Sequence, residues 1–345
     1  MNAESMIRDL EEKGFVEEEL PAGTDLRGEI LRMKKEKNAV ILAHYYQRPE
    51  IQDIADFVGD SLGLSRQAAG TDADIILFAG VHFMAETAKI LNPSRKVLIP
   101  DLRAGCSLES SCPPDKFRDF ISRHPGHTVV TYINCSAEVK AMSDIICTSS
   151  NAAQVVASIE PGIPVIFAPD HNLGKYVMKK TGRQMFLWNG QCDVHEAFSM
   201  DKINALRKIY PSAKFIAHPE SEEKLLEQAV FIGSTSALIG FVKKDPSDVF
   251  IVATEAGILH QMRKEVTGKK LIAAPAYENN TCACSECSFM KLNTMEKIYT
   301  TLKYEIPEII IPEPIRLRAL LPLQRMMQVS EQPGLSVAPA SHAAN

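Results

Sequence analysis

The 345-residue chain has no long apolar segment, and no run of about 18 consecutive apolar residues occurs in it. A membrane-spanning helix is therefore not expected. The first residues, MNAESMIRDLEEKGF, carry acidic side chains and no apolar core of the kind that a secretory signal requires. These two absences predict a cytoplasmic protein without a membrane partner.

Positive charge is not in excess, because 38 lysine and arginine residues stand against 43 aspartate and glutamate residues. With a net charge of −5 and no basic stripe, the chain is not expected to bind nucleic acid. The phosphate loop G-x-x-x-x-G-K-[ST], the dinucleotide motif G-x-G-x-x-G and the zinc-protease motif H-E-x-x-H are also absent. Nucleotide hydrolysis, dinucleotide-dependent redox chemistry and zinc proteolysis are therefore disfavoured, whereas binding of a small anion is not.

The chain does contain eight cysteines. Without a secretory signal, they are expected to be reduced thiols, metal ligands or buried residues rather than a disulfide framework. Three of them, Cys282, Cys284 and Cys287, fall within the stretch TCACSECS. Because no second Cys-x-x-Cys and no His-x₃₋₅-His pair occurs elsewhere, this loop is not expected to form a complete zinc site by itself.

Two other cysteines are suitably placed to complete a metal site. Cys106 in PDLRAGCSLESSCP and Cys192 in FLWNGQCDVHE each follow an apolar, strand-like run in a turn that contains glycine. The separation is 86 residues from Cys106 to Cys192 and 95 residues from Cys192 to Cys287. This spacing indicates one cysteine in each of three repeating units.

If Cys106, Cys192 and Cys287 converge, they supply three ligands to a [4Fe–4S] cluster, which normally takes four. One iron then has no protein ligand and can act as a Lewis acid on a substrate hydroxyl or carboxylate, which is a dehydratase strategy. A zinc ion held by three cysteines, with an open fourth position, is the alternative.

An internal repeat organises most of the chain. The similar apolar runs AVILAHYY, TVVTYINC and AKFIAHPE begin at Ala39, Thr128 and Ala213, with spacings of 89 and 85 residues. The helical segments between the strands supply the crossovers that parallel pairing needs. The predicted fold class is therefore α/β, with three αβα repeats of parallel sheet, related by pseudo-threefold symmetry, around a central cavity.

The expected boundaries follow from this repeat. Within the first unit, residues 1 to about 37 and about 51 to 57 are predicted to be helical. We expect an N-terminal arm with the first repeat, two further repeats, a helical C-terminal segment and a disordered tail, at residues 1–125, 126–210, 211–300, 301–329 and 330–345.

Polar residues follow the first strand of each unit at corresponding positions: His44 and Tyr46, Tyr132 and Asn134, and His218 and Glu220. Any one of them alone would be expected to be a loop residue or a hydrogen-bonded core residue. Three matching sets that face one cavity favour a site.

Hydroxyl-rich turns form a second repeated feature, at Asp60-Ser61, Thr148-Ser149-Ser150 and Ser234-Thr235-Ser236. Each precedes a predicted helix, so helix capping alone would explain these turns. The same N–H groups also attract phosphate or carboxylate.

The chain resembles the quinolinate synthase family from about residue 36 to residue 329. Eleven motifs carry the resemblance in order: AHYYQ, GDS, AGCSL, YINCSAEVKA, TSSNA, APDHNLG, WNGQCDVH, HPES, GSTS, ATEAGI and CSECSFMKLNT. The resemblance implies three αβα repeats around a [4Fe–4S] cluster. It also implies condensation of iminosuccinate (iminoaspartate) with dihydroxyacetone phosphate to quinolinate, phosphate and water in de novo NAD biosynthesis.

The resemblance further implies roles for individual residues. Cys106, Cys192 and Cys287 would be the cluster ligands, and Tyr46, Glu220 and His218 the catalytic residues. The substrate pocket would be lined by His44, Ser61, Tyr132, Asn134, Ser149, His195, His218, Glu220 and Thr235. In the cysteine loop the first spacing is one residue shorter than in many relatives, and Ser288 replaces a proline. This departure puts a disulfide between Cys282 and Cys284 in doubt, but leaves Cys287 as a ligand.

Two alternative functions remain open at this point. One is another [4Fe–4S] hydro-lyase that acts on a small polycarboxylate, and the other is a non-catalytic thiol or metal carrier. For the quinolinate synthase interpretation, pathway logic suggests L-aspartate oxidase as a partner that supplies unstable iminosuccinate.

Overall fold

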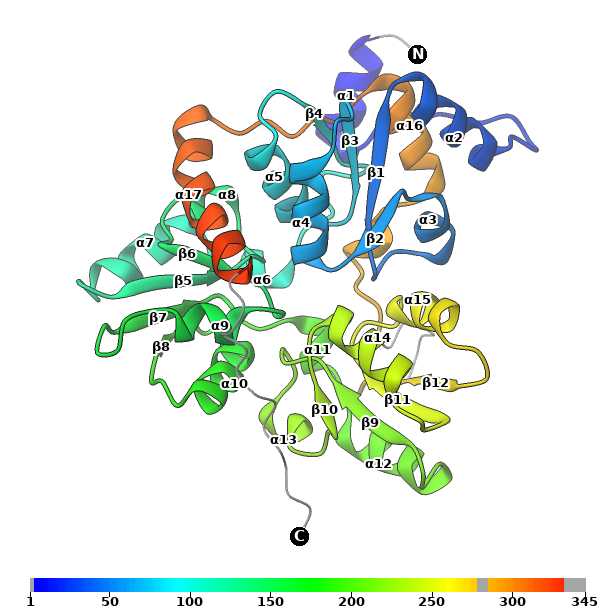
Figure 1. The fold of residues 1–345 in the computed structure, drawn as a ribbon. Helices are drawn as coiled ribbons and strands as arrows, with labels where there is room; N and C mark the ends of the chain where they lie inside the picture. Colours follow the sequence, from blue (N-terminus) through cyan, green and yellow to red (C-terminus); the bar gives the residue numbers. More distant parts are fainter. Residues whose placement is uncertain (1–2, 278–284, 332–345) are drawn as a thin grey trace. The chain divides into compact units, whose positions relative to one another are not determined.

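The structure is a computed structural model that describes residues 3–277 and 285–331. It contains three four-stranded sheets, and every strand pair in them is parallel (Figure 1). The strand orders are β2-β1-β3-β4, β6-β5-β7-β8 and β10-β9-β11-β12, so the same order occurs three times along the chain. These sheets confirm the predicted α/β fold of three repeated units.

The strands are short, and the two in the middle of each sheet are mostly buried. Their bounds are β1 Ala39–His44, β2 Phe57–Gly59, β3 Ile75–Ala79, β4 Lys96–Leu98, β5 Thr128–Tyr132, β6 Ile145–Cys147, β7 Val165–Ala168, β8 Phe186–Leu187, β9 Lys214–Ala217, β10 Phe231–Ile232, β11 Val249–Ala253 and β12 Lys270–Ala273. All five residues of β3 and all four of β7 are buried. Such continuous apolar runs are typical of parallel strands that are covered on both faces.

Helices precede the first strand, connect the strands of each sheet and follow the last sheet. Those of the first half are α1 Ala3–Lys13, α2 Leu26–Glu36, α3 Pro49–Ile54, α4 Ser61–Gly70, α5 His82–Leu91, α6 Ser107–Ser111, α7 Pro114–Ser122, α8 Ala137–Lys140 and α9 Ala152–Ala157. Those of the second half are α10 His171–Thr181, α11 Asp193–Glu196, α12 Met200–Ile209, α13 Glu223–Leu226, α14 Thr235–Lys244, α15 Ile258–Glu265, the 3₁₀ helix η1 Met290–Leu292, α16 Met295–Tyr304 and α17 Glu313–Glu331. No described helix is both long enough and apolar enough to span a membrane.

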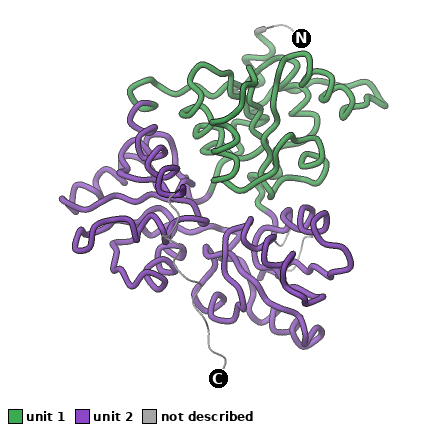
Figure 2. The backbone as a smooth tube through the Cα atoms, in the orientation of Figure 1, with its two compact units in different colours: residues 1–106, 287–316 green, residues 107–286, 317–345 purple. Residues whose placement is uncertain are grey.

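The chain divides into two compact units (Figure 2). The first comprises Met1–Cys106 and Cys287–Arg316, and the second comprises Ser107–Glu286 and Leu317–Asn345. In the core of the first unit, Ile298 and Leu302 of α16 pack with residues of α2, β1 and β3. The second unit contains the second and third sheets, each with its own apolar cluster. The repeat boundaries expected at residues 125, 210 and 300 stay a prediction.

Helices occur in both segments that were expected to be helical near the N-terminus, but their extents differ from the prediction. The helix expected over residues 51–57 ends at Ile54, and Phe57–Gly59 forms the edge strand β2, which pairs with β1. A three-residue edge strand has no periodicity that sequence analysis can detect. The N-terminal helical segment is divided in two, because Gly14 adopts a φ of +82° and Asp25 caps a new helix by accepting a hydrogen bond from the Gly28 N–H.

The disordered tail was expected to begin at residue 330. The first two residues of that range, Ser330 and Glu331, instead complete α17, where the Ser330 hydroxyl donates to the Met326 carbonyl. The rest of the predicted tail lies outside the described residues.

Candidate active site

Polar side chains follow the same strand in each of the three sheets. His44 ends β1 and is followed by Tyr46, Tyr132 ends β5, and His218 and Glu220 follow β9. Parallel strands have their carboxyl ends at one edge of the sheet, and ligands of open α/β sheets bind at that edge. These residues therefore lie at the carboxyl ends of their strands, as the sequence predicted, where a ligand is expected to bind.

In the second unit, Glu220 is the centre of a buried polar network and is 3% exposed. The Tyr132 hydroxyl donates a hydrogen bond to Glu220 Oε1, and His195 Nδ1 lies 3.0 Å from Glu220 Oε2. His218 Nδ1 lies 3.8 Å from Glu220 Oε1. The structure thus brings together four residues predicted to line the pocket, although Tyr132 and Glu220 are far apart in the sequence.

His195 connects this carboxylate to a cysteine. Its Nδ1 atom also lies 3.2 Å from Cys192 Sγ, and its Nε2 atom lies 3.0 Å from Thr254 Oγ1. The rings of His195 and His218 are 4.8 Å apart. Sequence analysis missed Thr254, although its hydroxyl stands directly after the apolar strand β11 in the ATEAGI motif.

His218 makes a further polar contact, because its Nε2 atom lies 3.1 Å from Ser149 Oγ. Ser149 follows β6, so one of the three hydroxyl-rich turns contributes to the network. Thr235 is the buried first residue of α14, and the adjacent Ser234 side chain caps this helix by accepting from the Ala237 N–H. The helix N-terminus is therefore capped, as the sequence allowed, and Thr235 places a hydroxyl after the end of β10. Anion binding by its N–H groups stays a prediction.

Asn134 follows β5, and one atom of its side chain lacks a hydrogen-bond partner in the described part of the chain. Its Oδ1 atom is buried and has no hydrogen-bond partner among the described residues. Buried polar atoms are normally paired. This atom therefore offers a contact for a polar ligand.

The charge on Glu220 depends on its neighbours. Burial would raise the pKa of this carboxyl, but the positive charges of His195 and His218 and hydrogen bonds from His195 and Tyr132 lower it below the usual 4.5. The structure thus stabilises the ionised form of Glu220.

Asp170 lies near this charge and was not predicted as a site residue. Complete burial, and then the charge of Glu220, raise the pKa of Asp170 well above its usual 3.8. Its Oδ1 atom caps α10 by accepting from the Leu173 N–H at 2.7 Å, whereas Oδ2 has no partner in the described part of the chain. A neutral Asp170 therefore accompanies an ionised Glu220. The only sequence signal was an aspartate directly before a helix in APDHNLG.

In the first unit, His44 and Tyr46 lie together. Their rings are 4.4 Å apart in an edge-on arrangement, and His44 Nδ1 accepts a hydrogen bond of 3.2 Å from the Tyr46 backbone N–H. The proton of neutral His44 is then on Nε2. The backbone carbonyl of Tyr46 in turn accepts from Lys291 Nζ at 2.7 Å, which fixes this turn to the segment that follows Cys287.

Ser61 begins α4, directly after Asp60, whose side chain caps the helix. The stretch Gly59–Gly63, GDSLG, has the G-x-S-x-G spacing of a nucleophile elbow, in which the serine sits on a strained turn. Among the described non-glycine residues, only Asn38 and Glu305 have a positive φ. Ser61 therefore begins an ordinary helix and does not have the geometry of a hydrolase nucleophile.

The predicted metal ligands differ from the other described cysteines in their exposure. Cys106 and Cys287 of the first unit and Cys192 of the second are partly exposed, whereas Cys112, Cys135 and Cys147 are buried. Burial raises the pKa of the Cys112 and Cys147 thiols, which makes them poor thiolate donors. Cys282 and Cys284 lie outside the described residues.

The turn before Cys192 requires a glycine. A Cβ atom at Gly190 would lie 2.3 Å from Ser111 Oγ and 2.5 Å from the Pro169 carbonyl oxygen. The Gly190 carbonyl accepts from the His171 N–H, and His171 Nδ1 lies 2.8 Å from the same oxygen. This turn is thus fixed against the end of β7.

The donor chemistry of these residues fits a metal group. Three partly exposed thiols are suitable ligands for an iron–sulfur cluster. Separately, the ligand atoms of Cys192, His195 and Glu220 all lie within 4.8 Å of one another, so this set could hold a single metal ion.

The fold and the site together define the class of the protein. A parallel α/β scaffold that buries an ionised carboxylate among two imidazoles, a phenol and a thiol is an enzyme scaffold equipped for acid–base chemistry. The family model for "Quinolinate synthetase A protein" matches residues 28–328. The chain belongs to the quinolinate synthase family.

Curated relatives agree with this assignment. The chain is 61% identical to the quinolinate synthase of Gloeothece citriformis over 307 residues, which cover 89% of this chain and 94% of the relative. It is 61% identical to that of Nostoc sp. over 306 residues, with the same coverage, and 59% identical to that of Thermosynechococcus vestitus over 310 residues, which cover 90% of this chain and 97% of the relative.

Proposed function

We propose that this protein is a quinolinate synthase that condenses iminosuccinate with dihydroxyacetone phosphate to give quinolinate, phosphate and water in NAD biosynthesis. The observation that carries the proposal is the buried, ionised Glu220 with Tyr132, His195 and His218 around it, in a chain that is 61% identical to named quinolinate synthases over 89% of its length. In a bacterial cell the pathway would place it in the cytoplasm, with L-aspartate oxidase as the supplier of iminosuccinate.

Cys106, Cys192 and Cys287 are proposed to hold a [4Fe–4S] cluster. Their partial exposure and the glycine-containing turns before Cys106 and Cys192 support this role. The cluster would supply a Lewis acid that assists the loss of a hydroxyl group from the substrate. The remaining chemistry belongs to protein side chains.

Glu220 is proposed as the general base that removes a proton from carbon during enolisation. Its lowered pKa keeps it ionised and ready to accept a proton. The Tyr132 hydroxyl and His195 orient the carboxylate through its two oxygens, one each. His218, held by Ser149, is proposed to assist proton transfer from the other side of the network.

Tyr46 is proposed as the acid that protonates a departing oxygen, because expulsion of hydroxide from carbon requires a proton. His44 contacts the Tyr46 ring edge-on and fixes its position. Both residues lie in the first unit at the end of β1.

The remaining polar residues are proposed to bind the anionic substrates. Ser61 and Thr235 begin the ten-residue helices α4 and α14, whose N–H groups attract phosphate and carboxylate. Asn134 offers its unsatisfied Oδ1 atom to a substrate donor such as the imine N–H.

Substrate omission tests this proposal against the other enzymatic interpretation. Anaerobically purified protein should form quinolinate only when both iminosuccinate and dihydroxyacetone phosphate are present. Turnover of a polycarboxylate without dihydroxyacetone phosphate, and no quinolinate with it, would instead establish a different hydro-lyase.

A further inference from the structure

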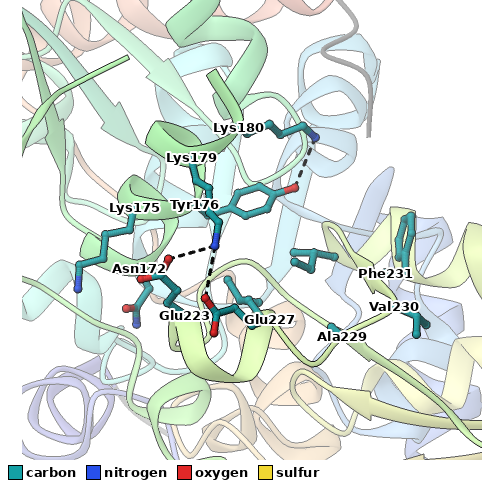
Figure 3. A pocket seen from close by; sticks show the side chains of 12 residues that line it. Asn172, Lys175, Tyr176, Lys179, Lys180, Glu223, Glu227, Ala229, Val230 and Phe231 are labelled. Atoms are coloured by element: carbon teal, nitrogen blue, oxygen red, sulfur yellow. Dashed lines mark hydrogen bonds and ion pairs between the residues drawn. The ribbon is translucent and has the colours of Figure 1, made fainter. Parts of the chain in front are cut away.

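A cavity lies in the second unit, between α10 on one side and α13 and β10 on the other (Figure 3). Its volume is about 150 Å³. One wall is formed by α10 and the other by α13, β10 and the residues between them; the lining residues are Asn172, Lys175, Tyr176, Lys179, Lys180, Glu223, Leu226, Glu227, Ala229, Val230, Phe231 and Ile232. None of these is among the residues predicted for the active site.

Apart from Glu223 and Glu227, the wall opposite α10 is apolar, and it reaches the surface. Leu226 and Ala229 are buried, whereas Val230 is 60% exposed although it is aliphatic. Phe231 is held in place by stacking on Phe241 at 4.4 Å. A concave apolar surface of this kind is typical of a small-molecule site.

The polar side of the cavity carries an excess of positive charge. Lys179 is neutralised by Glu223 at 3.2 Å and Glu227 at 3.5 Å, as Figure 3 shows. Lys180 instead contacts the Tyr176 hydroxyl at 3.4 Å and lies over its ring at 5.6 Å. With Lys175, three lysines line the cavity against two glutamates, so a bound ligand that carries one negative charge would be complementary.

The volume of the cavity limits the range of possible ligands further. A cavity of about 150 Å³ with apolar walls accepts a molecule of the size of benzene. A nucleotide or a sugar phosphate is too large for this volume, and a simple inorganic anion would leave the apolar wall uncovered. A planar ring with one carboxylate matches all three features of the cavity. The ring can pack on the Tyr176 ring and the apolar wall, and the carboxylate can pair with the Lys180 ammonium.

We propose that the cavity between α10 and α13 is a binding site for a small aromatic carboxylate, separate from the active site. Charge, volume and the mixture of aromatic and aliphatic walls carry this proposal. Binding itself does not depend on the function proposed above.

Asn172 connects the cavity to Glu220. Its Nδ2 atom donates to the Glu220 backbone carbonyl at 3.1 Å and also to the Glu196 carboxylate. A ligand seated against Asn172 would alter this support, so we expect it to change turnover without competing with the substrates. This consequence, unlike binding, rests on the proposed function.

Calorimetric titration of the complete protein with benzoate tests the site without any turnover. Benzoate should bind more tightly than benzyl alcohol or benzylamine, which have the same ring with no charge or with a positive charge. The variant Lys180→Gln should weaken benzoate binding about two- to fivefold, as expected for one partly exposed ion pair. Val230→Trp, which fills the cavity from its exposed edge, should abolish it.

Lys208→Gln is the matched control, because Lys208 is an exposed lysine in the last turn of α12 and does not line the cavity. Its affinity for benzoate should equal that of the wild type. The proposal is overturned if benzylamine binds as tightly as benzoate, or if Val230→Trp binds benzoate normally. Loss of benzoate binding in Glu220→Gln but not in Val230→Trp would place the ligand in the active site instead.

Discussion

Glu220 keeps its charge in a buried position because each of its oxygens has a partner. Tyr132 donates to one oxygen, His195 lies beside the other, and His218 adds positive charge nearby. An unpaired buried carboxylate would take up a proton instead. The same arrangement keeps Glu220 deprotonated, as a proton acceptor must be, although a lowered pKa also makes the carboxylate a weaker base.

Replacement of Glu220 by Gln should lower the rate of quinolinate formation by about 100-fold or more, the usual size of a general-base contribution. The amide still accepts a hydrogen bond from Tyr132, so the fold should persist, which circular dichroism can check. Glu265→Gln is the control, because Glu265 forms an exposed ion pair with Lys243 and does not belong to this network. Near-normal turnover in Glu220→Gln would remove Glu220 from the mechanism.

The raised pKa of Asp170 leads to a prediction about how the stability of the protein depends on pH. Because the folded-state pKa of this carboxyl is raised, its protonated form is retained in the folded protein while the unfolded chain ionises near pH 4. Asp170 should therefore reduce stability progressively as the pH rises from about 4 towards its folded pKa.

The variant Asp170→Asn keeps a side-chain oxygen for the α10 cap and removes the ionisation. Urea unfolding should show that the stability of this variant relative to the wild type increases between pH 4 and pH 7. A difference that is independent of pH, or one that changes in the opposite direction, would show that Asp170 is ionised in the folded protein.

Among the secondary-structure elements, the turn between β8 and α11 positions a predicted cluster ligand. Gly190 touches both Ser111 and the Pro169 carbonyl, so an alanine there must displace the backbone that leads to Cys192. Gly190→Ala should lower the iron and sulfide content of anaerobically prepared protein severalfold.

Gly240 provides the matched glycine control for this variant. It lies within α14, and a Cβ there would meet no atom within 4 Å. Gly240→Ala should leave the iron content unchanged and raise the free energy of unfolding by up to about 1 kcal/mol, because alanine has the higher helix propensity. Equal iron content in Gly190→Ala and the wild type would show that this turn does not position a ligand.

Helices and strands that have a strong local pattern of apolar residues could be predicted from the sequence. The runs that become β1, β5 and β9 were identified by their apolar character, and their parallel pairing followed from the helical crossovers between them. Strand β2 could not be predicted, because three residues at a sheet edge, including the 41% exposed Phe57, have no distinctive pattern. Local pattern also cannot show interactions across the chain, such as the contact of Thr254 with His195 or the effect of the Glu220 charge on Asp170.

In the whole molecule, threefold repetition explains why the candidate residues recur at regular intervals. Each sheet has the same strand order, and each presents polar residues after its first strand and a cysteine after its fourth. Residue types within a repeat could therefore be assigned to a site before the fold was known. The charges of Glu220 and Asp170 could not, because they depend on burial and on neighbours from different repeats.

The central claim is that Cys106, Cys192 and Cys287 hold a [4Fe–4S] cluster in a quinolinate synthase. The most direct test measures iron, sulfide and quinolinate formation in one anaerobic preparation of the wild type, of the three single cysteine-to-serine variants and of Cys112→Ala. The wild type and Cys112→Ala should contain about four irons and four sulfides per chain and form quinolinate, whereas each serine variant should lose both cluster and activity. Wild-type iron and sulfide content in Cys287→Ser, or zinc in place of iron in the wild type, would contradict the claim.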